Sequence, residues 1–425
     1  MTMYSLKQIA WTPSGEQPLN KPLPVKENRT LGAACMALIA IVAGAPAVAD
    51  TYVQTLTASH RGQVRSLSME EGLLFAEDTG EVIRVGTDAL VTVDFDRPRD
   101  PFQGRRLQIN LVKGDRVLGN LVQGDDEKIA VDSPGLGRIR IPLERVRTIQ
   151  TAAARDGAHR EAASWFIRRS SNEEDAVLLT NGDIVRGFIT GIETDGISIE
   201  AALGESRIDF RLVVAARIAV GDNQLPKGPL FVVSSVDGSR LTCTGFSYGD
   251  GKVKAETWFG PDASIPADRL RRIEVIGGRW EYLTGHDPVS YEQVPMLSVP
   301  WPWLTDRNVL GLPLRVAGQD YERGIGVHSR AVLVYDLGAG YSEFVTSAGV
   351  DDMSGPWADV SVAILLDGKP VFERTAVGRG ELIGPLRFDV SRAGTLTLRC
   401  DYGRNGDIQD RFNWIAPALI RKPTP

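Results

Sequence analysis

The chain has 425 residues and a formal net charge of -6 at pH 7, with 43% hydrophobic and 24% charged residues. This balance is ordinary for a soluble globular protein, and it excludes a collagen, a multi-span membrane protein and a largely disordered chain. The 44 glycines and 24 prolines favour many short strands over long helices. With three cysteines and four histidines, the chain cannot build a disulfide framework and has little capacity for zinc chemistry.

The first 49 residues have the pattern of a targeting segment. Residues 31–49 carry no charge, basic residues precede them, and they end in Ala47-Val48-Ala49. A basic region, an apolar stretch and an A-x-A site make up a secretory signal, and the same stretch is just long enough to span a bilayer. We therefore expect residues 1–49 to be a signal peptide or an N-terminal anchor. The protein would then be exported to the periplasm, the cell envelope or the extracellular space, and only an uncleaved segment would contact a membrane.

A four-fold repeat fills the middle of the chain. Its copies span residues 54–95, 107–149, 177–218 and 231–276, and the last three share a turn at Gly114-Asp115, Gly182-Asp183 and Asp237-Gly238. Each copy alternates apolar and polar residues between Gly, Asp or Asn turns, which is typical of short half-buried strands and hairpins. About five strands in about 42 residues predict a small, strongly bent β-barrel of SH3-like or Sm-like character.

One such unit buries too little apolar surface to be stable alone, so we expect the copies to pack in pairs. Residues 50–150 would form the first pair and residues 175–277 the second. Between them, residues 151–174 form either a plain linker or a short helix that docks Trp165 and Phe166 on a neighbour. The Gly-Asp pairs are interpreted as hairpin turns rather than calcium loops.

The repeats are not expected to bind nucleic acid. Sm-like units in other proteins bind RNA, but here acidic residues dilute the lysines and arginines, and residues 107–149 hold almost no aromatic side chains. Single-strand binding needs stacking platforms and a basic groove, and both are missing from this pattern. We expect the repeats to serve as a spacer or a docking scaffold, with other proteins of the cell envelope as candidate partners.

The C-terminal third is rich in aromatic residues and carries five spaced motifs. They are Tyr321-x-x-Gly-Ile-Gly-Val-His-Ser329, Tyr335-Asp-Leu337, Gly349-Val-Asp-Asp352, Asp367-Gly-Lys369 and Asp410-x-x-x-Trp414. In order and spacing, this segment resembles the NPCBM/NEW2 family of carbohydrate-binding modules, which occur next to some glycoside hydrolases. One difference is Arg411, where family members often have His, so the family's ligand specificity does not carry over directly.

The resemblance implies a galactose-binding-like β-sandwich of two antiparallel sheets over residues 278–421. The residues support this independently, because segments such as 344–350, 360–366 and 395–402 alternate or run apolar between Gly, Asp and Pro turns. The fold class is therefore mainly β, with tandem small β-barrel-like repeats followed by a C-terminal sandwich of jelly-roll type. Cys243 and Cys400 fall in different predicted domains, so we expect free, buried thiols.

Aromatic side chains are the first candidates for carbohydrate contact, because a pyranose face presents C–H groups to an indole. Trp357 follows Gly355-Pro356 in a loop and is the leading candidate, since recognition residues commonly sit on loops above a rigid scaffold. Trp303 either stacks on sugar or plugs one end of the sandwich. Trp414 is a further candidate, although its place in an apolar strand favours the core.

Polar candidates would supply hydrogen bonds to sugar hydroxyls. His328 either does so or ties a loop together, and Asp306 with Arg307 either orients hydroxyls or forms an internal pair. Asp352 is a further candidate contact. Asp351 could help to hold a structural calcium ion, since Ca²⁺ prefers carboxylate and carbonyl oxygens. We expect no other cofactor.

The sequence indicates a binding protein rather than an enzyme. A glycosidase needs two carboxylates across a cleft in a large catalytic domain, and no stretch of the chain remains for such a domain. The leading hypothesis is an exported, non-catalytic carbohydrate-binding protein; the alternatives are a structural or protein-interaction scaffold of the cell envelope and an accessory part of a glycoside hydrolase system. An exposed surface shared by Trp303, Trp357 and His328 would favour sugar binding, and burial of all three would favour the scaffold.

Overall fold

The structure is a computed structural model that describes residues 51–100, 107–168, 174–202, 204–221, 224–249, 252–260, 262–296 and 300–423. The predicted targeting segment, residues 1–49, lies outside the described residues. Within the described ranges, no helix has both the length and the apolar character needed to cross a bilayer.

Among the described residues, twenty strands form four units of five strands each. The first unit contains β1 (Thr51–Thr55), β2 (Ser59–Ser68), β3 (Gly72–Glu77), β4 (Val82–Val85) and β5 (Leu90–Asp94). The second contains β6 (Leu107–Leu111), β7 (Arg116–Gly124), β8 (Lys128–Ser133), β9 (Gly137–Pro142) and β10 (Val146–Gln150). The third contains β11 (Asp175–Leu179), β12 (Ile184–Glu193), β13 (Gly196–Ala201), β14 (Gly204–Asp209) and β15 (Val213–Arg217). The fourth contains β16 (Leu230–Ser235), β17 (Arg240–Gly249), β18 (Lys252–Thr257), β19 (Asp262–Ser264) and β20 (Leu270–Ile276).

All four units share one antiparallel topology. In each unit the first strand pairs with the second and the fifth, the second with the third, and the third with the fourth. The second strand always shifts register near its middle, for example between Leu121 and Gln123 in β7, and such a bulge bends a strand. The bend lets one long strand pair with two neighbours, which confirms the prediction of small, strongly bent β-barrel-like repeats.

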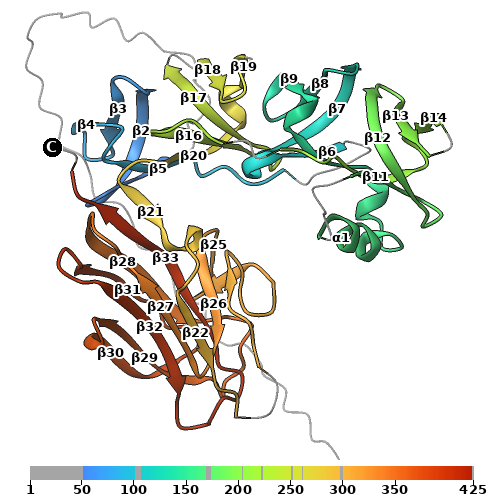
Figure 1. Cartoon of the computed structure of the whole chain (residues 1–425). Helices are drawn as coiled ribbons and strands as arrows, with labels where there is room; N and C mark the ends of the chain where they lie inside the picture. The colour runs from blue at the N-terminus through green and yellow to red at the C-terminus, as the bar shows by residue number, and fades with distance from the viewer. Residues whose placement is uncertain are drawn as a thin grey trace, which may run out of the picture. The chain divides into compact units, whose positions relative to one another are not determined.

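The units pair with one another differently from the prediction. The fifth strands β5 and β20 pair between the first and fourth units (Figure 1). Between the second and third units, β10 pairs with β15. The fourth and second units meet where Arg240 of β17 lies opposite Arg116 of β7. The prediction that neighbouring copies would form the pairs is therefore wrong. Alternation along a strand shows which face is buried, but it does not show which unit will cover a free strand edge.

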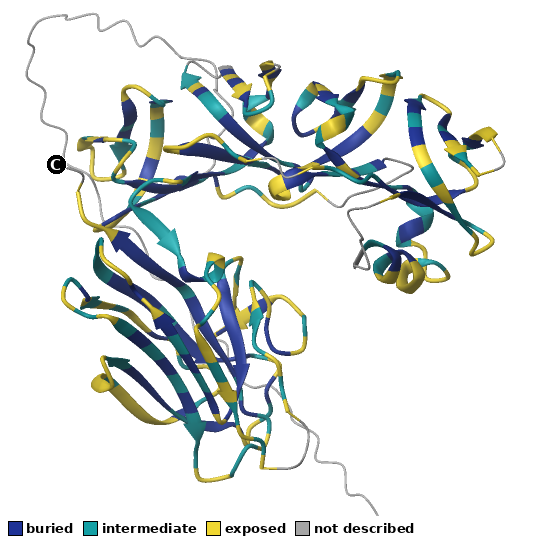
Figure 2. Cartoon of the chain, viewed as in Figure 1, coloured by how far each residue is buried: buried dark blue, intermediate teal, exposed yellow. Residues whose placement is uncertain are grey.

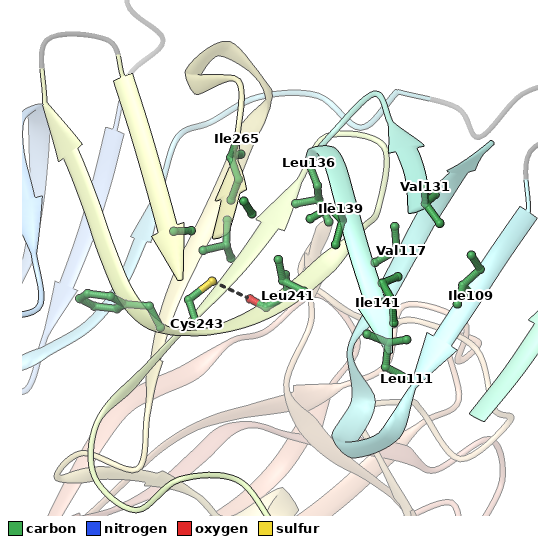
Figure 3. Packing of buried hydrophobic residues seen from close by; sticks show 14 of the residues in the cluster. Ile109, Leu111, Val117, Val131, Leu136, Ile139, Ile141, Leu241, Cys243 and Ile265 are labelled. Carbon is green, nitrogen blue, oxygen red and sulfur yellow. Dashed lines mark hydrogen bonds between the residues drawn. The ribbon is translucent and has the colours of Figure 1, made fainter. Parts of the chain in front are cut away.

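The units share a continuous apolar core. Figure 3 shows Ile109, Val117, Val131 and Ile141 of the second unit pointing toward one another, and all four side chains are fully buried. Cys243 lies in the fourth unit's part of this core, and burial raises the pKa of its thiol. Both Cys243 and Cys400 are free and buried, as predicted.

The segment between the second and third units is helical. A 3-10 turn, η3 (Ala152–Arg155), precedes α1 (Arg160–Arg168). Phe166 is buried and packs with Ala176 and Val214 on the third unit. The helical alternative for this segment is therefore confirmed for Phe166, whereas Trp165 is 47% exposed. The remaining short turns are η1 (Val112–Gly114), η2 (Leu143–Arg145), η4 (Ala267–Arg269) and η5 (Leu283–Gly285).

The C-terminal third is a sandwich of two antiparallel sheets, as predicted. One sheet has the order β23-β26-β33-β28-β31, with β21 also on β33; the other has the order β22-β27-β32-β29-β30, and β24 and β25 form a separate hairpin. The strands are β21 (Trp280–Tyr282), β22 (Ser290–Gln293), β23 (Leu304–Thr305), β24 (Leu314–Val316), β25 (Gln319–Tyr321), β26 (Gly324–His328), β27 (Ala331–Asp336), β28 (Tyr341–Val350), β29 (Asp359–Leu366), β30 (Lys369–Gly378), β31 (Ile383–Asp389), β32 (Thr395–Tyr402) and β33 (Arg411–Arg421).

Apolar side chains from both sheets fill the space between them. Phe344 and Phe412 from one sheet and Tyr335 from the other belong to a single buried cluster. Figure 2 shows buried residues along the central strands and exposed residues in the loops. The sandwich is thus a rigid support for the loops at its ends, and most of the candidate functional residues lie in those loops.

Candidate functional site

Several loops of the sandwich meet at the ends of β26, β28, β32 and β33. The two that carry the argument are residues 351–358, between β28 and β29, and residues 403–410, between β32 and β33; we call them the Trp357 loops. Asn405 Nδ2 donates to the Trp357 carbonyl at 2.9 Å, and Arg411 Nη1 donates to the Met353 carbonyl at 2.9 Å. These bonds tie the two loops into one surface.

The Trp357 loops expose a set of apolar side chains. Trp357 is 63% exposed, Met353 56% and Ile408 52%. Polar groups stand beside them, because the hydrogen-bonded Asn405 lies in the second loop and Arg411 directly follows it. An exposed indole flanked by amide and guanidinium donors can stack on an apolar ring face and hydrogen-bond to hydroxyls around it.

Trp301 and His328 form a second aromatic feature. Their ring centroids lie 4.9 Å apart with planes 7° from parallel. His328 is only 5% exposed and its Nδ1 donates to the Ser329 carbonyl at 3.0 Å. Burial lowers the pKa of His328, so the ring is neutral near pH 7. His328 therefore ties a loop together in this structure, and of the two interpretations open at the sequence level the structure favours that one.

The two remaining predicted tryptophans lie away from solvent to different degrees. Trp414 is completely buried and packs against Phe412, with ring centroids 5.2 Å apart. The structure does not support its prediction as a carbohydrate contact, because β33 is buried along nearly its whole length and Trp414 packs in the sandwich core. Trp303 is partly buried and packs against the same core, which favours the plug over the stacking platform.

Asp306 and Arg307 lie in a loop that is held to β26. Asp306 accepts hydrogen bonds from Arg323 Nη1 at 2.9 Å and from the Gly324 backbone N–H at 3.2 Å. Arg307 is exposed and its Nη1 lies 3.3 Å from the Gly311 carbonyl. Asp306 thus forms an internal pair, although with Arg323 rather than with Arg307, its neighbour in the sequence.

Asp351 is a buried hydrogen-bond acceptor. It is 0% exposed, and it accepts from Asn413 Nδ2 at 2.6 Å, from Asn308 Nδ2 at 3.2 Å and from the Met353 N–H at 2.9 Å. These neighbours direct N–H groups at the carboxylate, whereas Ca²⁺ needs six to eight oxygen ligands. Across the described residues, no group of three or more His, Cys, Asp or Glu could hold a metal ion. The surroundings of Asp351 therefore do not fit calcium.

Asp352 belongs to the first Trp357 loop, but its carboxylate binds residues of the β24–β25 hairpin. Its Oδ2 accepts from the Gly318 N–H at 2.8 Å and lies 3.5 Å from Arg315 Nε. Together with Met353 and Arg379, these residues line a small surface pocket. The polar candidates are therefore dispersed, and the structure does not bring them all to the exposed face of Trp357.

Sequence reasoning missed Asp410 as a candidate site residue; it ends the second Trp357 loop, and its carboxyl binds Ser329 and Asp359. It is completely buried, accepts from Ser329 Oγ at 2.7 Å and from the Asp359 N–H at 3.1 Å, and burial raises its pKa to about 6. Its neighbour Asp359 binds Arg404 Nε at 3.1 Å. The spacing to Trp414 in the motif draws attention to Asp410 only as a landmark, because a sequence does not show that the carboxyl lies between two loops.

The fold is a two-sheet sandwich with an exposed tryptophan, Trp357, on its loops. Residues 282–420 match the NPCBM/NEW2 domain, which confirms the resemblance seen in the motifs. The match covers the C-terminal third of the chain. No curated protein matches the chain.

Several solved structures of carbohydrate-binding modules resemble the chain. One is CBM51 from Clostridium perfringens GH95 in complex with methyl-galactose, at 23% identity over 33% of this chain and 99% of that chain, with a TM-score of 0.30. A second holds CBM51-2 in complex with GlcNAc and INT domains from Clostridium perfringens ZmpB, at 19% identity over 41% and 39%, with a TM-score of 0.28. A third holds the tandem CBM51 modules of the family 98 glycoside hydrolase Sp3GH98 from Streptococcus pneumoniae, at 10% identity over 58% and 88%, with a TM-score of 0.30.

Proposed function

We propose that the protein is an exported, non-catalytic carbohydrate-binding protein and that glycan binds at the Trp357 loops. The four five-strand units would act as a spacer or docking scaffold. The domain match supports glycan binding, and the observation that carries the choice of surface is the 63% exposure of Trp357 on a loop pinned by Asn405. Export remains a prediction from residues 1–49.

Recognition would combine stacking with hydrogen bonds. The Trp357 indole would cover the C–H face of a pyranose, while Asn405 and Arg411 would donate to hydroxyls at its edge. Because the surface is shallow and each sugar hydroxyl must exchange water for protein, affinity at a single site would be weak. The buried Asp410 and the Trp301–His328 stack would hold the loops without touching the sugar.

A protein-interaction role in the cell envelope is the second candidate. It is favoured by the burial of His328 and the partial burial of Trp303, since two of the three side chains that would have marked a sugar surface are not freely available. In that case Met353, Trp357 and Ile408 would form a small apolar contact for a protein partner.

The test is a glycan-array and affinity-gel screen of the protein, with Trp357→Ala and a matched control. Trp165→Ala is that control, because Trp165 is also an exposed tryptophan but lies on α1. We expect retention on a defined glycan that falls about tenfold or more in Trp357→Ala and is unchanged in Trp165→Ala. If the folded protein is retained on no glycan, the carbohydrate proposal fails and the protein-interaction role gains support.

A further inference from the structure

The first hairpin turn of the second unit and the first hairpin turn of the fourth unit form hydrogen bonds with each other. Asp115, in the turn of the second unit, accepts from the Thr242 N–H at 3.0 Å and the Thr242 hydroxyl at 2.7 Å. In return Ser239, in the turn of the fourth unit, accepts from the Leu118 N–H at 2.9 Å. Asp115, Thr242 and Ser239 are all buried. We call this reciprocal contact the clasp.

The third unit carries the same turn. Gly114, Gly182 and Gly238 have φ angles of 89°, 92° and 90°, a left-handed conformation that favours glycine. In each turn the backbone oxygen of the residue after the glycine accepts from an N–H four residues earlier: Leu111 to Asp115, Leu179 to Asp183, and Ser235 to Ser239. Asp183 therefore occupies the position that Asp115 and Ser239 hold in the clasp.

The strand that follows the turn also keeps its register. Gln108 lies opposite Leu118, Val232 opposite Thr242, and Ala176 opposite Arg186. Leu118 and Thr242 direct their N–H groups away from the first strand and into the clasp. By the same register, the Arg186 N–H points outward from β12.

The corresponding positions in the third unit are exposed in the part of the chain that the structure describes. Asp183 and Arg186 are exposed, whereas Asp115 and Leu118 are buried. Val185 is only partly buried, although its equivalents Val117 and Leu241 are 0% exposed. The third unit thus has the acceptor, Asp183, and the N–H donor, Arg186, of the clasp, but among the described residues no second turn binds them.

The first unit shows that such a turn can also be covered by other means. Its turn between β1 and β2 packs Leu56 in an apolar cluster with Val345 and Ile420 of the sandwich. Arg387 of the sandwich also donates to the Leu56 carbonyl. Among the described residues, the turns of the first, second and fourth units are therefore covered and that of the third is open to solvent.

We propose that the protein self-associates by forming the clasp between the third units of two copies. A reciprocal contact between identical elements needs two-fold symmetry, which is the arrangement of an isologous dimer. Asp183 of each copy would accept from the Arg186 N–H of the other and lie near its guanidinium, so the charges are complementary. Where the internal clasp sets Arg116 opposite Arg240, the dimer would set the uncharged Ile184 opposite Ile184.

Sedimentation of the protein at several concentrations tests this proposal. We expect a concentration-dependent dimer that is lost in Asp183→Lys, because the introduced ammonium group would face Arg186 of the second copy. Asp268→Lys is the matched control: it makes the same charge change at a carboxylate 81% exposed on the fourth unit, and it should leave the dimer intact. A protein that stays monomeric throughout, or a dimer that survives Asp183→Lys, would overturn the proposal.

A disulfide crosslink tests whether the third units of two copies meet, whatever the stability of the dimer. Ile184→Cys, in a Cys35→Ser background, should form an interchain disulfide on mild oxidation, because directly opposed residues of antiparallel strands have Cα atoms about 4.5–5.5 Å apart, within disulfide range. Lys369→Cys on β30 is the control and should crosslink far less. Equal crosslinking by the two variants would show random collision and contradict the two-fold contact.

Discussion

The indole of Trp301 lies flat against the imidazole of His328, with ring centroids 4.9 Å apart and ring planes 7° from parallel. The Trp301 backbone is fixed on both sides, because its N–H donates to Gln293 Oε1 at 3.0 Å and its carbonyl accepts from the Tyr291 hydroxyl at 2.6 Å. The stack therefore joins β22 to the end of β26. It is a contact that positions the segment leading to Trp303.

Replacing Trp301 by alanine should raise the pKa of His328. Burial lowers this pKa, so the neutral ring favours folding; that stability is present above the ordinary pKa of about 6.5 and is lost as pH falls through the lower folded value. Without the indole, water reaches the ring and the folded pKa moves back toward 6.5. An NMR titration of the histidine Cε1 protons measures this, with His328→Gln to assign the signal.

Trp165→Ala is the control for this titration, since Trp165 lies on α1 and not at His328. An unchanged His328 pKa in Trp301→Ala would show that the sandwich core alone, and not the stack, keeps the imidazole dry.

Asp410→Asn should remove a pH dependence of stability on the acid side of neutrality. Burial raises the pKa of Asp410 to about 6, above the value of 3.8 expected in the unfolded chain. The protonated carboxyl therefore stabilises the fold; this contribution is fully present below about pH 4 and is lost as pH rises through about 6. Its size is on the order of 1–3 kcal/mol.

Urea unfolding of the sandwich, followed by tryptophan fluorescence between about pH 4 and pH 7, provides the measurement. The wild type should lose stability relative to Asp410→Asn over this range. Ser329→Ala, which removes the hydroxyl that donates to Asp410 at 2.7 Å, should steepen the dependence. If the free energy of unfolding changes with pH in the same way for the wild type and Asp410→Asn, Asp410 is not the titrating group.

Local pattern is enough to predict the strands and the loop position of Trp357, whereas the sandwich comes from the family resemblance that the strand pattern supports. Trp357 is recognisable because it follows Gly355-Pro356 and belongs to no apolar alternation, so a loop position is the simplest interpretation. Trp414 is a candidate contact by residue type although its place in an apolar strand favours the core, and in the structure it is buried in the core. Within a strand, sequence and structure thus agree when the apolar pattern is given priority over residue type.

Contacts between distant segments are beyond the reach of the sequence. Asp351 and Asn413 are 62 residues apart and meet at 2.6 Å, and no local pattern links them. The same limit explains the wrong pairing of the units, because β5 and β20 offer similar edges to β10 and β15. Such choices depend on edge-to-edge complementarity in three dimensions, which alternation along one strand does not encode.

Calcium should not stabilise the protein. An ion present at about 100 times its dissociation constant would add about 2.7 kcal/mol to the free energy of unfolding. The carboxylate of Asp351 instead accepts N–H groups from Asn308, Asn413 and Met353, so no such gain is expected. The Tm of the protein should be the same with calcium and with chelator. A clearly higher Tm with calcium would contradict this interpretation of the Asp351 surroundings.

Asp351→Ala should destabilise the sandwich by about 2–5 kcal/mol, because two buried amide groups lose their acceptor. Asp352→Ala is the matched control, since Asp352 is only partly buried and binds Gly318 at the surface. We expect it to cost less than about 1.5 kcal/mol. Equal losses for the two variants in urea unfolding would show that the hydrogen bonds to Asp351 carry no special weight.

Trp414 gives the sharpest separation between a core role and a binding role. Trp414→Ala should lower the free energy of unfolding by about 3–5 kcal/mol. The Trp414 side chain is 0% exposed, so its removal would leave a large cavity between the sheets. Trp414→Phe should cost less, since it keeps an aromatic ring against Phe412 and the buried indole Nε1 has no hydrogen-bond partner among the described residues. Because the side chain does not reach the surface, glycan retention by folded Trp414→Phe should equal that of the wild type. Suppose that folded Trp414→Phe loses glycan retention while its free energy of unfolding equals that of the wild type. Trp414 would then be a contact residue, and the binding surface would lie away from the Trp357 loops.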